Sequence, residues 1–235
     1  MVNCNTTSVF HVLKDDPGNW TGKIVYMDTC FVMLNYGHSG TRFDLDETKN
    51  FSTFLVGADA LMIASKWVEH ELRTGIESYH ISQARDPQNT STQEYAKKVL
   101  RRHPGLISAA YNDFVLLRDK LISNPSVLLI GNTCNESDMD DLVKKGELRT
   151  ADALHYAIAK HNSSGGLVTY DRDFLNVTET SVQIILGTEA YVKSCVYNNT
   201  PIERSLLDYY LINKKKLGES PFAKALNYTI FKAET

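Results

Sequence analysis

The stretch from Leu148 to Phe174, LRTADALHYAIAKHNSSGGLVTYDRDF, constrains the fold more than any other part of the chain. Its first half predicts a helix with Thr150 as N-cap and Asp152 in the first turn, where the helix dipole favours an anion. Gly165-Gly166 is expected to end this helix with a residue of positive φ.

The second half of the stretch predicts a short buried strand, Leu167–Thr169, which ends close to Asp171 and Asp173. Open α/β folds bind their ligands at the carboxyl ends of parallel strands. Other acids that follow strands are therefore expected to join these two.

Short apolar runs alternate with helical patterns along the chain. Parallel strands need crossover connections, which the intervening helices supply. Asp46, Ser65 and Thr188 are predicted N-caps of three of these helices. We therefore predict the α/β class: a three-layer α/β/α sandwich with a central, mainly parallel sheet, plus added helices. The predicted strands are residues 23–27, 60–64, 126–130, 167–169 and 182–186.

The domain organisation follows from the same pattern. We predict an N-terminal extension at 1–22, a core domain at 23–195 and a C-terminal helical extension at 196–235. A helical insertion, at about 77–123, is predicted to be a hairpin whose second arm buries an apolar stripe.

Composition excludes several classes of protein. A chain of 235 residues with 43% hydrophobic residues can fill a sizeable core. There is neither a signal-peptide pattern nor an apolar run long enough to span a membrane, so a cytoplasmic protein with no membrane partner is expected. The four cysteines show no zinc-binding spacing and are expected to be free thiols.

The net charge of −3 argues against a protein that wraps nucleic acid with its whole surface. A local basic patch remains compatible with this balance. The candidates for contact with phosphates are Lys97, Lys98, Arg101 and Arg102, for which a solvated charged face is the alternative interpretation, together with Arg149 and Arg172.

Four acids are expected at one edge of the predicted sheet. Asp28 and Asp171 follow strands, Asp152 opens a helix, and Glu71 lies inside the helix capped by Ser65. Gathered carboxylates repel one another by several kcal/mol, so such a cluster is stable only around a cation. Oxygen ligands favour Mg²⁺ or Mn²⁺, which would activate water for attack on a phosphodiester.

Each acid also has a structural interpretation when it is taken alone. Asp152 could stabilise a helix N-terminus, Asp28 could cap the next helix, and Asp171 and Asp173 could be turn residues. Glu71 could lie on the surface, with Glu69 as a rival for its role. Only their joint placement favours a metal site.

Four segments resemble the PIN-domain ribonucleases, and most closely the VapC-type toxins of toxin–antitoxin pairs. They are VYMDT at Val25–Thr29, S-x-x-V-x-x-E-L-x-x-G at Ser65–Gly75, ADALHYAIA at Ala151–Ala159 and LVTYDRDF at Leu167–Phe174. The resemblance covers residues 23–195 and implies a parallel α/β/α sandwich.

The resemblance also implies roles for particular residues. Asp28, Glu71 and Asp152 would be the core metal ligands and catalytic acids, with Asp171 as the fourth acid and Asp173 as its neighbour or substitute. Thr29 and Thr169 would be polar residues that support the ligands. The expected cofactor is Mg²⁺ or Mn²⁺, and the expected substrate is RNA.

Three functional hypotheses follow. The first is a metal-dependent endoribonuclease, with an antitoxin, another protein or a second copy of the chain as further partner. The second is a non-catalytic RNA-binding or assembly module with the same fold. The third is a phosphatase or phospho-acceptor centred on Asp28, which the absence of a second Asp two residues later disfavours.

Overall fold

The computed structural model describes residues 7–9, 20–37, 42–84, 103–198 and 202–213. In this part of the chain, six strands form one sheet in the order β1-β6-β5-β2-β3-β4, and all of the pairings are parallel. The strands are β1 (Thr7–Val9), β2 (Ile24–Met27), β3 (Leu61–Ser65), β4 (Val127–Ile130), β5 (Gly166–Thr169) and β6 (Gln183–Leu186).

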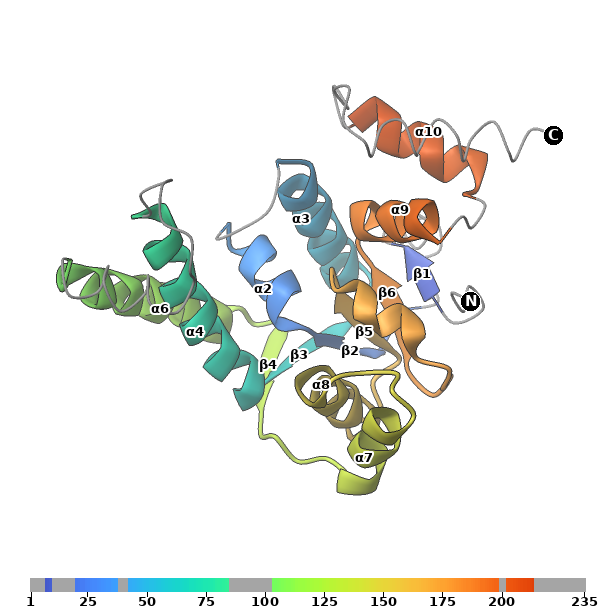
Figure 1. The fold of residues 1–235 in the computed structure, drawn as a ribbon, viewed down its shortest axis with the longest axis horizontal. Coiled ribbons are helices and arrows are strands. Elements are labelled where there is room, and N and C mark those ends of the chain that lie inside the picture. Colours follow the sequence, from blue (N-terminus) through green and yellow to red (C-terminus); the bar gives the residue numbers. More distant parts are fainter. Residues whose placement is uncertain (1–6, 10–19, 38–41, 85–102, 199–201, 214–235) are drawn as a thin grey trace.

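Helices cover both faces of the sheet, as Figure 1 shows. Helices α2, α3 and α4 lie on one side, and α7 and α8 lie on the other. This arrangement confirms the predicted α/β/α sandwich. The helical elements are α2 (Thr29–Asn35), α3 (Arg42–Gly57), α4 (Lys66–Gln83), α6 (Gly105–Ser123), α7 (Glu136–Lys144), α8 (Thr150–His161), the 3₁₀ helix η2 (Arg172–Asn176), α9 (Thr188–Tyr197) and α10 (Arg204–Asn213).

The predicted strands appear within about one residue of their expected bounds, because each is a short run of apolar residues. Strand β4, which was expected to be buried, is an edge strand with Leu128 50% exposed. Strand β1 was not predicted, since the pattern indicated no strand before residue 23. Its sequence, Thr7-Ser8-Val9, pairs with Ile184–Leu186 of β6 and extends the sheet at that edge.

Helices α4 and α6 pack against each other, whereas most of the first arm of the predicted hairpin falls outside the described residues. Ala110, Phe114, Leu117 and Leu121 of α6 are buried, which confirms most of the predicted apolar stripe. Burying such side chains contributes about 1.5–3 kcal/mol for each large one. The residues that join the two helices, 85–102, lie outside the described part of the chain.

Three of the predicted helix starts were wrong. Asp46 lies inside α3, which begins at Arg42. Thr150 and Thr188 are the first helical residues of α8 and α9 rather than their caps, and neither N-terminus has a side-chain cap bond. The Ser65 cap of α4 is confirmed, since its hydroxyl accepts a hydrogen bond from the Val68 N–H.

The exit from α8 also differs from the prediction. The residue with positive φ is Ser163, at 52°, and not a glycine. Gly166 instead lies inside β5, where an added Cβ would be 2.5 Å from Ile185 Cδ1 and 2.9 Å from the Trp20 ring. Glycine is needed here because the core leaves no room for a side chain.

None of the described helices is both long enough and apolar enough to cross a membrane.

Candidate metal centre

The carboxyl ends of β2 and β5 bring two acids to the same edge of the sheet. Met27 of β2 is in register with Val168 of β5, and the Asp28 N–H donates to the Val168 carbonyl oxygen over 3.1 Å. Asp28 follows β2 directly, and Asp171 follows β5 after one intervening residue. Parallel pairing therefore places both acids where the prediction expected them.

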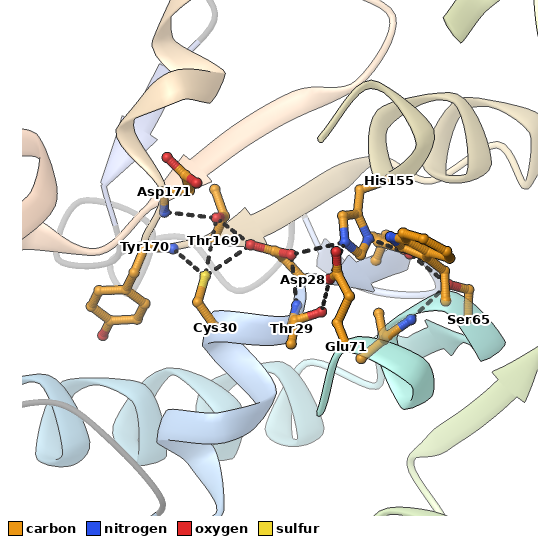
Figure 2. A network of polar contacts seen from close by, with 12 residues as sticks. Asp28, Thr29, Cys30, Ser65, Glu71, His155, Thr169, Tyr170 and Asp171 are labelled. Atoms are coloured by element: carbon orange, nitrogen blue, oxygen red, sulfur yellow. Dashed lines mark hydrogen bonds and ion pairs between the residues drawn. The ribbon is translucent and has the colours of Figure 1, made fainter. Parts of the chain in front are cut away.

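Asp28 is a buried carboxylate held by several donors, as Figure 2 shows. It is the N-cap of α2, and its Oδ1 accepts from the Thr29 N–H at 2.6 Å. Its Oδ2 accepts from the Thr169 hydroxyl at 2.7 Å and from the Cys30 thiol at 2.8 Å. The capping role and the proposed ligand role thus coexist in one side chain.

Glu71 reaches the same edge from α4. Its carboxylate accepts hydrogen bonds from the Thr29 hydroxyl, at 2.5 Å, and from His155 Nε2, at 2.8 Å. Burial raises the pKa of Glu71, but the bond and the charge of His155, with the Thr29 bond, outweigh it and lower the pKa overall. Glu69, the alternative candidate for the role of Glu71, instead forms a salt bridge of 2.6 Å with Arg118 of α6.

His155 is the residue of this centre that the sequence analysis did not find. It lies on α8 three residues after Asp152 and is 1% exposed. Its Nε2 is 2.8 Å from Glu71 and 3.4 Å from Asp28, while its Nδ1 is 2.8 Å from the Tyr26 hydroxyl. The i, i+3 spacing from Asp152 was a signal that both side chains share one helix face.

The electrostatics of His155 follow from these contacts. Burial lowers the pKa of the imidazole, but the negative charges of Asp28 and Glu71 and the hydrogen bond to Glu71 raise it overall. The ring is therefore a counter-charge between two acids. Asp28, Glu71 and His155 form one group whose potential ligand atoms lie within 4.8 Å of one another.

A second group consists of Asp152, Asp171 and Asp173, whose ligand atoms also lie within 4.8 Å of one another. Asp171 is the N-cap of η2 and accepts from the Asp173 N–H at 2.8 Å. Asp171 and Asp173 therefore both belong to the same group as Asp152.

The charges of the second group repel one another. Burial, followed by the charges of Asp171 and Asp28, raises the pKa of Asp152 to about 6. Burial, with the charges of Asp173 and Asp28, also raises the pKa of Asp171. The negative charge of Asp28 contributes to the raised pKa of both Asp152 and Asp171, so the two groups are coupled electrostatically. The two groups together are called the acidic centre.

Two of the six basic candidates, Arg149 and Arg172, belong to the described residues, and both are exposed. Arg149 is the residue before α8, and the Arg172 guanidinium lies 5.4 Å from the centroid of the Tyr197 ring. The other four basic candidates, Lys97, Lys98, Arg101 and Arg102, fall outside the described residues.

A cavity of about 330 Å³ lies elsewhere, between α4 and α6. Arg73, Glu77, Ile107 and Tyr111 are among its lining residues, and it contains none of the acids of the two groups. The acidic centre is therefore not part of this cavity.

Comparisons of the chain with protein-family models, with curated proteins and with solved structures find no match.

Proposed function

We propose that this protein is a metal-dependent endoribonuclease that hydrolyses RNA phosphodiester bonds with Mg²⁺ or Mn²⁺. The observation that carries the proposal is the convergence of Asp28, Glu71, Asp152, Asp171 and Asp173 at one edge of a parallel sheet. The resemblance of the four sequence segments to PIN-domain ribonucleases supports the same activity.

The chemistry of the donors fits a hard divalent cation. Asp152, Asp171 and Asp173 offer oxygen atoms alone, which is the ligand type that Mg²⁺ and Mn²⁺ prefer. Burial and, after it, the charges of Asp171 and Asp28 raise the pKa of Asp152, so ionising this carboxyl without a cation is unfavourable. A bound cation would remove the repulsion between these charges.

In the proposed reaction, the ion would be held by acids of the two groups, which are Asp28, Glu71, Asp152, Asp171 and Asp173. The ion would activate a water molecule and stabilise the charge that develops on the phosphate. His155 and Thr29 keep the Glu71 carboxylate in place through their hydrogen bonds. Arg149 and Arg172 are exposed and would attract the RNA backbone.

The test is cleavage of total RNA by the purified chain, with Mn²⁺ and with EDTA, compared between the wild type and two variants. We expect Asp28→Asn and Asp152→Asn to lose at least about 100-fold in rate, since single pre-organised charged groups contribute on this scale. Asp119→Asn is the matched control, because Asp119 is an exposed acid of α6 outside both groups.

Two results would contradict the proposal. Undiminished cleavage by Asp28→Asn would show that the activity does not come from this centre. A wild-type protein that neither cleaves RNA nor binds Mn²⁺ would favour the non-catalytic RNA-binding or assembly module.

The partner of the protein is part of the same proposal. Ile107 and Tyr111 of α6 lie one turn apart on the same helix face and expose 49% and 50% of their surface. Apolar side chains gathered on one helix are suited to a protein partner, either an antitoxin or a second copy of the chain. If a small protein encoded beside this chain abolishes cleavage, the toxin assignment is supported.

A further inference from the structure

Cys30 contacts the acidic centre without belonging to either group of potential ligands. It lies in the first turn of α2, and its Sγ is 2.8 Å from Asp28 Oδ2. The same sulfur accepts a hydrogen bond from the Tyr170 N–H at 3.1 Å and lies 3.3 Å from Thr169 Oγ1. Cys30 therefore connects the end of β2 with the end of β5 (Figure 2).

The 2.8 Å contact between Cys30 Sγ and Asp28 Oδ2 is a hydrogen bond that the thiol donates. A protonated thiol has one hydrogen to donate, and the Asp28 carboxylate, which can only accept, takes it. The Tyr170 N–H donates a hydrogen bond to a lone pair of the sulfur.

The hydrogen bond from Cys30 to Asp28 acts together with a bond from a second donor. The Thr169 hydroxyl also donates to Asp28 Oδ2, at 2.7 Å, and in turn accepts from the Asp171 N–H at 2.9 Å. One carboxylate oxygen thus receives hydrogen bonds from the end of β5 and from the first turn of α2. Rotation of the Asp28 carboxylate would break both bonds, so its orientation is set by Cys30 and Thr169 together.

We propose that Cys30 is a positioning residue of the metal centre, whose thiol holds the Asp28 carboxylate in the orientation that binds the divalent cation. This inference rests on the proposed function, because it assigns the hydrogen bond a role in metal affinity. Groups that bond to metal ligands in this way typically contribute about 10-fold to 100-fold to affinity or activity.

A purely structural role makes the opposite prediction for substitutions. If Cys30 only fills space, Cys30→Ala or Cys30→Val would bind metal with normal affinity. Cys30→Ser would then have no higher affinity for the metal than these two variants. If the hydrogen bond matters, Cys30→Ser keeps a donor and retains affinity, whereas the alanine and valine variants lose it.

The experiment measures the Kd for Mn²⁺ by calorimetry on the full chain, with the melting temperature of each metal-free variant as a check on folding. We expect Cys30→Ala to weaken binding by about 10-fold to 100-fold. Cys30→Ser should stay close to the wild type. Cys134→Ala is the control, because Cys134 is also a partly buried free cysteine but lies in the segment after β4.

The outcomes separate this inference from the proposed function. Equal affinity of the wild type and Cys30→Ala overturns the positioning role and leaves the metal centre standing. Equal weakening in Cys30→Ser and Cys30→Ala also overturns it, since the donor would then not be the cause. A wild type that binds no Mn²⁺ overturns both proposals. If Cys30→Ala does not fold, Cys30→Val provides the same comparison while filling the space.

Discussion

Burial and the charges of Asp171 and Asp28 raise the pKa of the Asp152 carboxyl to about 6, above its ordinary value of 3.8. An acid with a higher pKa in the folded state destabilises the fold once it ionises. This loss of folding free energy is absent below pH 3.8, grows as the pH rises toward 6 and is complete above pH 6. Asp152 therefore weakens the metal-free protein at neutral pH.

Asp152→Asn should therefore stabilise the protein in EDTA at pH 7.5. The gain should be about 1 kcal/mol, because solvent at the edge of the sheet screens part of the repulsion. Thermal unfolding at pH 7.5 and pH 4.5 measures it, and the gain should shrink at the lower pH. Asp119→Asn should show no such dependence, and a less stable Asp152→Asn at pH 7.5 would contradict the argument.

At the scale of elements, the strands were predictable and the helix starts were not. Val25–Met27 and Ile184–Leu186 are almost fully buried, and burial on both faces leaves a continuous apolar run in the sequence. The start of a helix is harder to predict, because several neighbouring polar residues could each serve as the N-cap. Helix α8 begins at Thr150 with no side-chain cap at all.

Strand β1 could not be predicted for a related reason. Thr7-Ser8-Val9 has no distinctive pattern, and its pairing partner β6 lies more than 170 residues later in the chain. The acids of the centre were predictable because each sits beside a recognisable strand or helix. His155 and Cys30 were not, because only the folded structure shows what their side chains contact.

Strand β5 depends on the absence of a side chain at Gly166. An alanine there would place its Cβ 2.5 Å from Ile185 Cδ1 and 2.9 Å from the Trp20 ring, so the core would have to move. We expect Gly166→Ala to destabilise the protein by about 1–3 kcal/mol, the usual cost of overpacking. Urea unfolding measures the change.

Gly57→Ala is the matched control for this substitution. Gly57 ends α3, and no atom lies within 4 Å of an added Cβ. Alanine should therefore be neutral there or stabilise by up to about 1 kcal/mol through its helix propensity. Equal stability of Gly166→Ala and the wild type would mean that β5 has more room than its contacts indicate.

At the scale of the whole molecule, the metal is expected to act as a stabilising ligand. An ion that binds only the folded state adds about 2.7 kcal/mol at a concentration of 100 times its Kd. For a chain of this length, each kcal/mol raises the melting temperature by about 2–4 °C. Mn²⁺ should therefore shift the unfolding midpoint upward by several degrees.

The same titration with Asp28→Asn shows where the ion binds. The shift should largely disappear in this variant and persist in Asp119→Asn, because Asp28 contacts both groups of the centre and Asp119 contacts neither. A full shift in Asp28→Asn would place the ion elsewhere on the molecule.

The acids of the centre come from four distant segments of the chain, at Asp28, Glu71, Asp152 and Asp171. During synthesis the first two leave the ribosome long before β5 exists, and β5 must pair with β2 before Asp171 can reach Asp28. A partly translated chain therefore has no complete set of acids. If the protein cuts RNA, its own messenger and ribosome are spared until nearly the whole sheet has been made.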